Sequence, residues 1–65
     1  MKLIRIKEVM EITGMSRTSI YDMSHDGRFP KFVRLSQRSS AWIHEEVLLW
    51  VESKIAERNK NIRAK

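Results

Sequence analysis

The chain has 65 residues, contains no cysteine and carries a formal net charge of +5 at pH 7. Its length fits one small domain, which buries only ~60% of the surface that its unfolded chain exposes. The lack of cysteine excludes a disulfide and a cysteine-based zinc site, and the basic balance favours an anionic partner, nucleic acid first and an anionic membrane second.

The first expected elements are a short strand and a short helix. Residues 1–6 are expected to be extended and could form a short strand, with Leu3, Ile4 and Ile6 apolar and Lys2 and Arg5 between them. Lys7–Thr13 follows as a helix of about two turns, with Val9 and Ile12 on one side. Gly14 comes directly after this pattern, where a helix end requires a left-handed backbone. A helix this short is stable only when it packs against other elements.

A second helix is expected over Ser16–His25. Ser16 is placed to cap its first turn, Ile20 and Met23 supply its buried side, and Gly27 follows its end. The positions between the apolar residues are expected to face away from the core. They are Arg17, Thr18, Ser19, Tyr21 and Asp22.

A hairpin is expected next. Phe29-Pro30 forces extended backbone, since a residue before proline avoids the helical region. Lys31–Arg34 and Ala41–Ile43 are the predicted strands, and the polar segment Ser36–Ser40 between them is the predicted tip. No Asn-Gly or Asp-Gly turn supports this interpretation, so the signal is weaker than for the helices.

The last helix is predicted over His44–Arg58. Two glutamates occupy its first turn, where the helix dipole favours negative charge. A stripe of apolar residues, at helical spacing, would face the core: Val47, Trp50, Val51 and Ile55. The aromatic residues Phe29, Trp42 and Trp50 are expected in the core rather than on a binding face.

Strand, helix, turn, helix, hairpin and helix in this order describe a winged helix-turn-helix. The expected fold is therefore mainly α with a small β-hairpin, a short N-terminal strand, three helices and a wing. We expect residues 1–58 to form one DNA-binding domain and residues 59–65 to form a basic, frayed tail. In such a domain the second helix enters the major groove of double-stranded DNA.

The predicted DNA-binding residues of the second helix lie near its start. Arg17 stands beside amides that are free to bind a phosphate, and the short side chains of Thr18 and Ser19 allow close approach. Tyr21 could contact a phosphate or a base, or it could be an aromatic residue at the edge of the core. Asp22 and Asp26 would repel phosphates, so we expect the DNA-facing part to be the segment from Ser16 to Tyr21.

The wing supplies the other predicted contacts. Arg38 at its tip, with Gln37 and Ser39 beside it, could reach a groove or the DNA backbone next to the second helix. Lys31 and Arg34 flank this segment, and charges at such positions also deter edge-to-edge aggregation.

These motifs together resemble the AlpA family of small phage and prophage regulators. The resemblance covers about Leu3 to Arg58 and rests on IKEVMEITGMSRTSIYDMSHDGRFPKFVRL (residues 6–35), on Arg38 and Trp42, and on EEVLLW (residues 45–50). It implies a winged helix-turn-helix of the excisionase and MerR type that binds DNA through residues 16–19 and Tyr21, with the wing around Arg38. The chain departs from that pattern in having no glycine in the wing, Ser24 at a usually apolar position and Leu49 at a usually small one.

Three classes of function remain open at this point. A transcriptional regulator and an excisionase, which bends DNA for an integrase, would use the same contacts. A protein-interaction adaptor or anti-repressor would instead use an apolar patch of Leu48, Leu49 and Ile62. An enzyme is not expected, because the sequence has no nucleophile-base pair, no metal-ligand set and no phosphate loop. Double-stranded DNA, further copies of the chain on adjacent sites and an integrase are the candidate partners.

Nothing in the sequence points to a membrane, a metal or a cofactor. The longest apolar run, residues 47–51, is too short to span a bilayer or to form a signal-peptide core. His25 and His44 have no clustered ligands around them, so we expect surface or capping roles. Because the chain begins at Met1 without a cleavable leader, we expect a cytoplasmic, nucleoid-associated protein.

Overall fold

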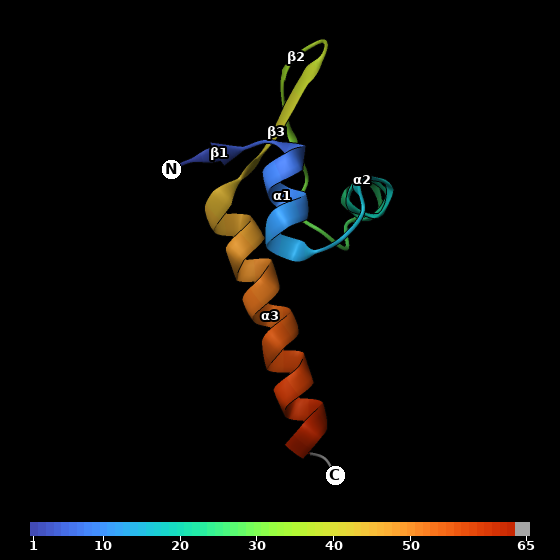
Figure 1. Ribbon diagram of the computed structural model, residues 1–65, viewed down its shortest axis with the longest axis vertical. Coiled ribbons are helices and arrows are strands. Elements are labelled where there is room, and N and C mark those ends of the chain that lie inside the picture. Colours follow the sequence, from blue (N-terminus) through green and yellow to red (C-terminus); the bar gives the residue numbers. More distant parts are fainter. Residues whose placement is uncertain (64–65) are drawn as a thin grey trace.

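The computed structural model describes residues 1–63, and the surroundings of side chains up to residue 60. It is a winged helix-turn-helix with three helices and a small antiparallel sheet (Figure 1), which confirms the predicted fold class. In chain order the elements are β1 (Leu3–Ile4), α1 (Ile6–Thr13), α2 (Arg17–Asp26), β2 (Val33–Ser36), β3 (Ser39–Ile43) and α3 (His44–Arg63).

The turn between α1 and α2 is built as the sequence predicts. Gly14 has a φ of 73°, and its amide donates to the Met10 carbonyl at 2.8 Å, which closes α1. The Thr13 hydroxyl donates to the Val9 carbonyl and accepts from the Met15 amide, at 2.8 and 3.2 Å. These bonds satisfy backbone groups that a helix end leaves without partners, so the turn is fixed locally.

The sheet has the order β1-β3-β2, with β3 paired to both neighbours. Leu3 pairs with Ile43 at one end of β3, and Val33 pairs with Ala41 in the hairpin. The hairpin made by β2 and β3 rises from the helical body as the wing (Figure 1).

The predicted bounds of the hairpin strands are wrong. β2 spans Val33–Ser36 instead of Lys31–Arg34, and β3 begins at Ser39 instead of Ala41, so the wing is longer and its tip is only residues 37–38. The ladder between the strands consists of backbone bonds, which polar residues form as readily as apolar ones. Phe32 instead packs on the core, before β2 begins.

The core lies between α1, α2, the sheet and the first turns of α3. Its buried apolar residues are Ile4, Val9, Ile20, Phe29, Ala41, Trp42 and Val47. Trp42 is 0% exposed, and its indole N–H donates to the Ser24 hydroxyl oxygen at 3.3 Å and to the Pro30 carbonyl at 3.1 Å. The Ser24 hydroxyl in turn donates to the Pro30 carbonyl at 3.0 Å. Ser24 is therefore buried with its hydroxyl satisfied, and it supplies one of the two acceptors of the buried indole.

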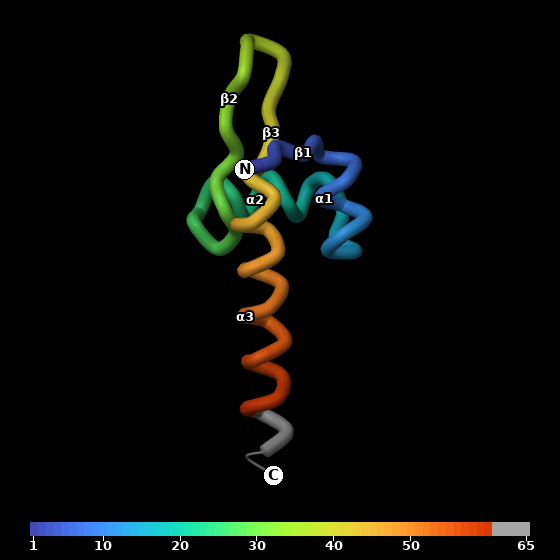
Figure 2. Tube along the Cα trace, turned by 90° about the vertical axis from the view of Figure 1, so that its left-hand side faces the viewer, coloured from blue at the N-terminus to red at the C-terminus, as the bar shows by residue number. Residues whose placement is uncertain are grey.

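Helix α3 is longer than predicted and leaves the core midway. It continues to Arg63, past the expected end near Arg58, because no glycine or proline interrupts the sequence after Pro30. Its second half extends away from the other elements (Figure 2). Ile55, predicted in the buried stripe, is 45% exposed for this reason. Residues 64–65 and the side chain of Ile62 lie outside the described residues.

Within residues 1–63, no helix is both long enough and apolar enough to cross a membrane.

Candidate nucleic-acid interface

The start of α2 presents the first group of predicted site residues. The Ser16 hydroxyl accepts a hydrogen bond from the Ser19 amide at 3.2 Å, which confirms Ser16 as the cap. The Ser16 hydroxyl also donates to the Ser19 hydroxyl oxygen at 3.0 Å, so these two side chains are hydrogen-bonded to each other in the absence of a ligand. Arg17 and Thr18 are exposed in the first turn, and neither side chain forms a hydrogen bond or an ion pair within the described part of the chain.

Tyr21 does not face away from the core, and that prediction is wrong. Its ring is half-buried and meets the rings of Phe32 and Trp42 edge-on, with centroid distances of 5.7 and 5.5 Å. Position 21 lies at the border of the buried face of α2, which carries Ile20 and Ser24. A large aromatic ring at such a border gains more from packing than from solvation. Tyr21 is thus an edge-of-core residue, and only its hydroxyl end is a candidate for a DNA contact.

The wing carries the second group of predicted site residues. Gln37 and Arg38 form its exposed tip, and Ser39 beside them is half-buried at the start of β3. The Arg34 guanidinium donates to the Gln37 carbonyl at 3.2 Å and lies 5.8 Å from the centre of the Phe32 ring. Arg34 therefore braces the hairpin while keeping its charge near the tip.

Lys31 is separated from the wing residues. It is exposed in the connection between α2 and β2, where it lines a surface hollow together with Glu46 of α3. The structure thus brings Arg34, Gln37, Arg38 and Ser39 together on the hairpin, and Ser16, Arg17, Thr18 and Ser19 together on α2. Lys31 belongs to neither of these groups.

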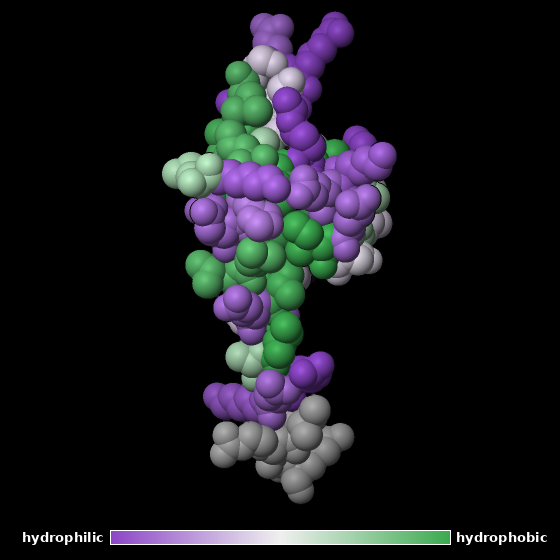
Figure 3. All heavy atoms as spheres, turned by 60° about the vertical axis from the view of Figure 1, so that its left-hand side comes forward, coloured by the Kyte–Doolittle hydropathy of each residue, from purple (hydrophilic) through white to green (hydrophobic). Residues whose placement is uncertain are grey.

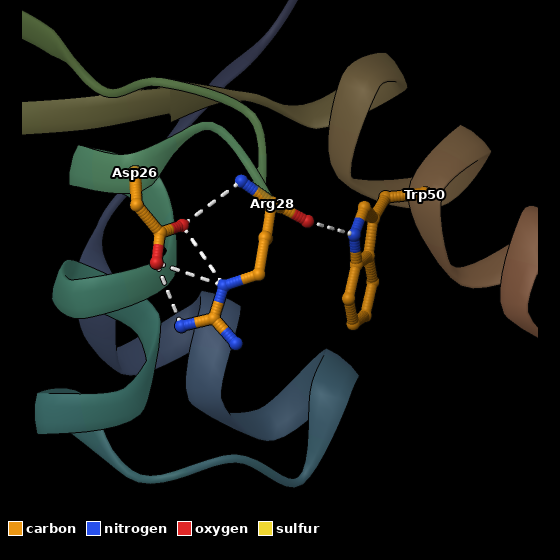
Figure 4. A network of polar contacts seen from close by, with 3 residues as sticks. All are labelled: Asp26, Arg28 and Trp50. Atoms are coloured by element: carbon orange, nitrogen blue, oxygen red, sulfur yellow. Dashed lines mark hydrogen bonds and ion pairs between the residues drawn. The ribbon is translucent and has the colours of Figure 1, made fainter.

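An ion pair at the end of α2 changes the expected electrostatics. Both carboxylate oxygens of Asp26 accept from the Arg28 guanidinium, at 2.8 to 2.9 Å (Figure 4). This hydrogen bonding lowers the pKa of Asp26, and Asp26 raises the pKa of Arg28. The charge of Asp26 is therefore largely offset. Asp22, by contrast, is in no ion pair within residues 1–60.

The same arginine connects the end of α2 to α3. Its carbonyl accepts a hydrogen bond from the Trp50 indole N–H at 2.8 Å, which Figure 4 shows. Phe29, the next residue, meets the Trp50 ring edge-on at 4.8 Å. Sequence reasoning missed Arg28, although the Asp-Gly-Arg spacing after a predicted helix was a usable signal: the turn at Gly27 brings residues 26 and 28 together.

Among the residues described, no group of three or more histidine, cysteine, aspartate or glutamate side chains lies close enough to hold a metal ion. The exposed side chains of the predicted site residues on α2 and on the wing are cationic or hydrogen-bonding groups. They suit recognition of an anionic, polar surface.

Comparison with known proteins identifies the family. The family model for the prophage CP4-57 regulatory protein (AlpA) matches residues 2–55, which include both helices of the helix-turn-helix and the wing. Uncharacterized protein ORF88 of Enterobacteria phage P4 is 38% identical over 63 residues, covering 97% of this chain and 72% of that protein. The DNA-binding transcriptional activator AlpA of Escherichia coli (strain K12) is 32% identical over 59 residues, covering 82% of this chain and 84% of that protein. The resemblance predicted from the sequence is thereby confirmed, and the chain belongs to the family of the prophage CP4-57 regulatory protein AlpA.

Proposed function

We propose that this protein is a sequence-specific, double-stranded DNA-binding transcriptional regulator of phage or prophage type, acting in the cytoplasm on the nucleoid. The observation that carries the proposal is the first turn of α2. Ser16 caps it, and Arg17 and Thr18 are exposed there, with no side-chain hydrogen bond or ion pair to residues 1–60. The family relationship supports the same function, since one relative is named a DNA-binding transcriptional activator.

In the proposed complex, α2 lies in the major groove with its first turn closest to the DNA. The amides of that turn and the guanidinium of Arg17 bind phosphate, which sets the position of the helix. Thr18 is short enough to allow close approach and offers a hydroxyl and a methyl group to base edges. Ser16 and Ser19 contribute mainly through the cap, and the Tyr21 hydroxyl reaches a phosphate from the edge of the core.

The wing supplies the second half of the proposed contact. Arg38 at the tip binds the backbone or the adjacent groove, and Gln37 and Ser39 add hydrogen bonds there. Arg34 adds charge from β2 while it braces the hairpin. Lys31, exposed before β2 and apart from both groups, adds a separate contact to a phosphate. A single module of this kind buries only ~600–1,000 Å² of protein surface on DNA, so one copy binds weakly and several copies on adjacent sites are expected.

DNase footprinting on the prophage and integrase promoter regions tests the proposal, because it gives the site, its spacing and the number of copies together. Arg17→Ala should abolish the footprint while leaving the thermal unfolding curve unchanged, since the exposed Arg17 side chain forms no hydrogen bond or ion pair in the described part of the chain. Arg58→Ala, on the projecting part of α3, is the matched control and should keep the footprint. An unchanged footprint with Arg17→Ala would contradict the placement of α2.

The same contacts would serve an excisionase, which differs in bending its site and in acting with an integrase. Circular-permutation gel assays and excision assays with the integrase encoded nearby separate the two roles. An adaptor or anti-repressor would give the opposite mutational pattern from a DNA-binding protein. In that case Arg17→Ala would leave activity intact and Leu49→Asp would abolish it.

A further inference from the structure

A groove runs between α3 and the connection that leads from α2 to the wing. It consists of two adjoining hollows of about 630 and 450 Å³. The two hollows share four lining residues: Pro30, Lys31, Glu46 and Leu49. One wall is residues 27–33 and the other is the first half of α3 with Ile43 before it. We call it the α3 groove.

Apolar side chains are exposed in and around this groove. Leu49 is 63% exposed, although it lies in the half of α3 that packs on the core. Val33 on the opposite wall and Leu48 beside Leu49 are each 38% exposed. Figure 3 shows hydrophobic residues gathered over the hairpin and over the upper part of α3. Contiguous exposed apolar surface of this kind is typical of an interaction site.

The charges of the α3 groove make it complementary to itself. Lys31 stands on the wall formed by residues 27–33 and Glu46 stands on the wall formed by α3. Neither forms an ion pair among the described residues. An interface with two-fold symmetry uses the same patch on both copies, so it requires a patch that carries both halves of each contact. A groove with one cation, one anion and a projecting leucine meets that requirement.

We propose that the α3 groove binds a second copy of this chain in a two-fold arrangement. Leu49 of each copy enters the groove of the other, against Ile43 and Val33. Lys31 of each copy meets the partner's Glu46, which gives two equivalent ion pairs. This surface lies apart from the first turn of α2 and from the wing tip, and Lys31 is the residue that it shares with the proposed DNA contacts.

Charge reversal tests this arrangement in the absence of DNA. Sedimentation equilibrium of the wild-type chain should show a reversible monomer-dimer equilibrium. Leu49→Asp should weaken the dimer at least tenfold. Lys31→Glu and Glu46→Lys should each weaken the dimer several-fold, because each puts two like charges together in both ion pairs. The double variant Lys31→Glu/Glu46→Lys should restore the dimer, because position 31 of each copy again meets an opposite charge at position 46 of the other.

Leu35→Asp is the matched control. Leu35 is 46% exposed on the wing and lines neither hollow, so this change should leave the dimer intact. Circular dichroism checks that each variant is folded. A wild-type chain that stays monomeric to about 1 mM, a double variant that does not recover, or an equal effect of Leu35→Asp would each overturn the proposal. Loss of regulation by Leu49→Asp in a monomeric protein would assign the groove to a different protein.

An independent observation concerns Asp22, and the inference from it rests on the proposed function. Thr18, Asp22 and His25 follow one another at spacings of four and three residues, so they share one exposed face of α2. Asp22 lies in the middle of this face. The other carboxylate of α2, Asp26, is held by Arg28, whereas Asp22 accepts no hydrogen bond among the described residues.

Arg28 attracts Asp22 electrostatically but forms no ion pair with it among residues 1–60. In the centre of a helix that lies in the major groove, such a carboxylate repels phosphates unless a hydrogen-bond donor faces it. In the major groove the fitting donor is the exocyclic amino group of a base, and an aspartate pairs in this way with the N4 amino group of cytosine. The geometry points to Asp22 as a residue that reads a cytosine one helical turn beyond the position of Thr18.

Paired affinity measurements test the role of Asp22. For Asp22→Ala, the ratio of the affinity for the footprinted site to that for a random duplex should fall about 5- to 100-fold, because one base contact is lost. Binding selection from a library randomised within the site should lose its cytosine preference at one position. Glu52→Gln, which removes an exposed carboxylate from α3, is the control and should keep both properties.

Two other results have separate meanings. If Asp22→Ala raises affinity for the site and for random DNA by the same factor, Asp22 only repels phosphates and the inference fails while the DNA-binding function stands. If Arg17→Ala leaves the wild-type affinity for the site unchanged, the proposed placement of α2 fails instead.

Discussion

The salt dependence of DNA binding can be worked out from the exposed basic residues of the proposed interface. They are Arg17 on α2, Lys31 before β2, and Arg34 and Arg38 on the wing. Each phosphate neutralised contributes about −0.9 to the slope of log affinity against log salt concentration. Four contacts give a slope of about −3.6, so affinity should fall roughly 150-fold between 50 and 200 mM salt.

Arg38→Ala should make this slope shallower by about 0.9, which reduces the loss over the same range to roughly 40-fold. The wing tip bonds to its surroundings through the backbone amide of Arg38, which donates to the Ser36 hydroxyl, so its side chain can be removed without disturbing the fold. Fluorescence anisotropy at nanomolar protein gives the slopes, and Arg58→Ala should leave the slope unchanged. A slope near zero, or an equal change with Arg58→Ala, would refute the assignment of the basic contacts.

Three stability predictions follow from single contacts. Ser24→Ala should lower the free energy of unfolding by ~1 kcal/mol and Tm by roughly 4–8 °C, since the Trp42 indole keeps only the Pro30 carbonyl; thermal denaturation gives both values. Gly14→Ala should cost ~1 kcal/mol in chemical denaturation, purely from the positive φ, because a Cβ there meets no atom within 4 Å. Arg28 holds the pKa of Asp26 in the folded protein below its usual value. The ion pair therefore stabilises the fold fully above the usual pKa of an aspartate, and this stabilisation is lost as the pH falls through the lowered pKa of the folded state. Asp26→Asn removes the ion pair, so the fall of Tm below about pH 4 should become less steep.

The features that sequence reasoning placed correctly are determined within a few residues of chain. Ser16 caps α2 because its hydroxyl reaches the amide of Ser19, three residues on. Gly14 ends α1, and Gly27 follows α2, because each backbone is left-handed, with φ values of 73° and 86°. Such signals depend on local geometry alone, so the helix-turn-helix can be predicted from the sequence without knowledge of the packing.

The features that were missed depend on residues far apart in the chain. The packing of Tyr21 depends on Phe32 and Trp42, two residues from later segments that lie against α2. Ser24 is buried because its hydroxyl lies between the Pro30 carbonyl and the indole of Trp42. The exposure of Ile55 follows from the length of α3 relative to the body of the domain, which helical periodicity does not encode.

The connection between α2 and the wing links the two proposed interfaces through Lys31. This connection is held on α3 by the hydrogen bond from the Trp50 indole N–H to the Arg28 carbonyl. A Lys31 side chain paired with the partner's Glu46 is not available to a phosphate. Lys31→Ala should therefore make the salt slope shallower by about 0.9 at nanomolar protein, where the chain is monomeric, and by less at concentrations where the dimer forms. By linkage, DNA binding and association then weaken each other, because the same ammonium group serves both contacts. An effect of Lys31→Ala that is the same at both protein concentrations would separate the groove from the DNA interface.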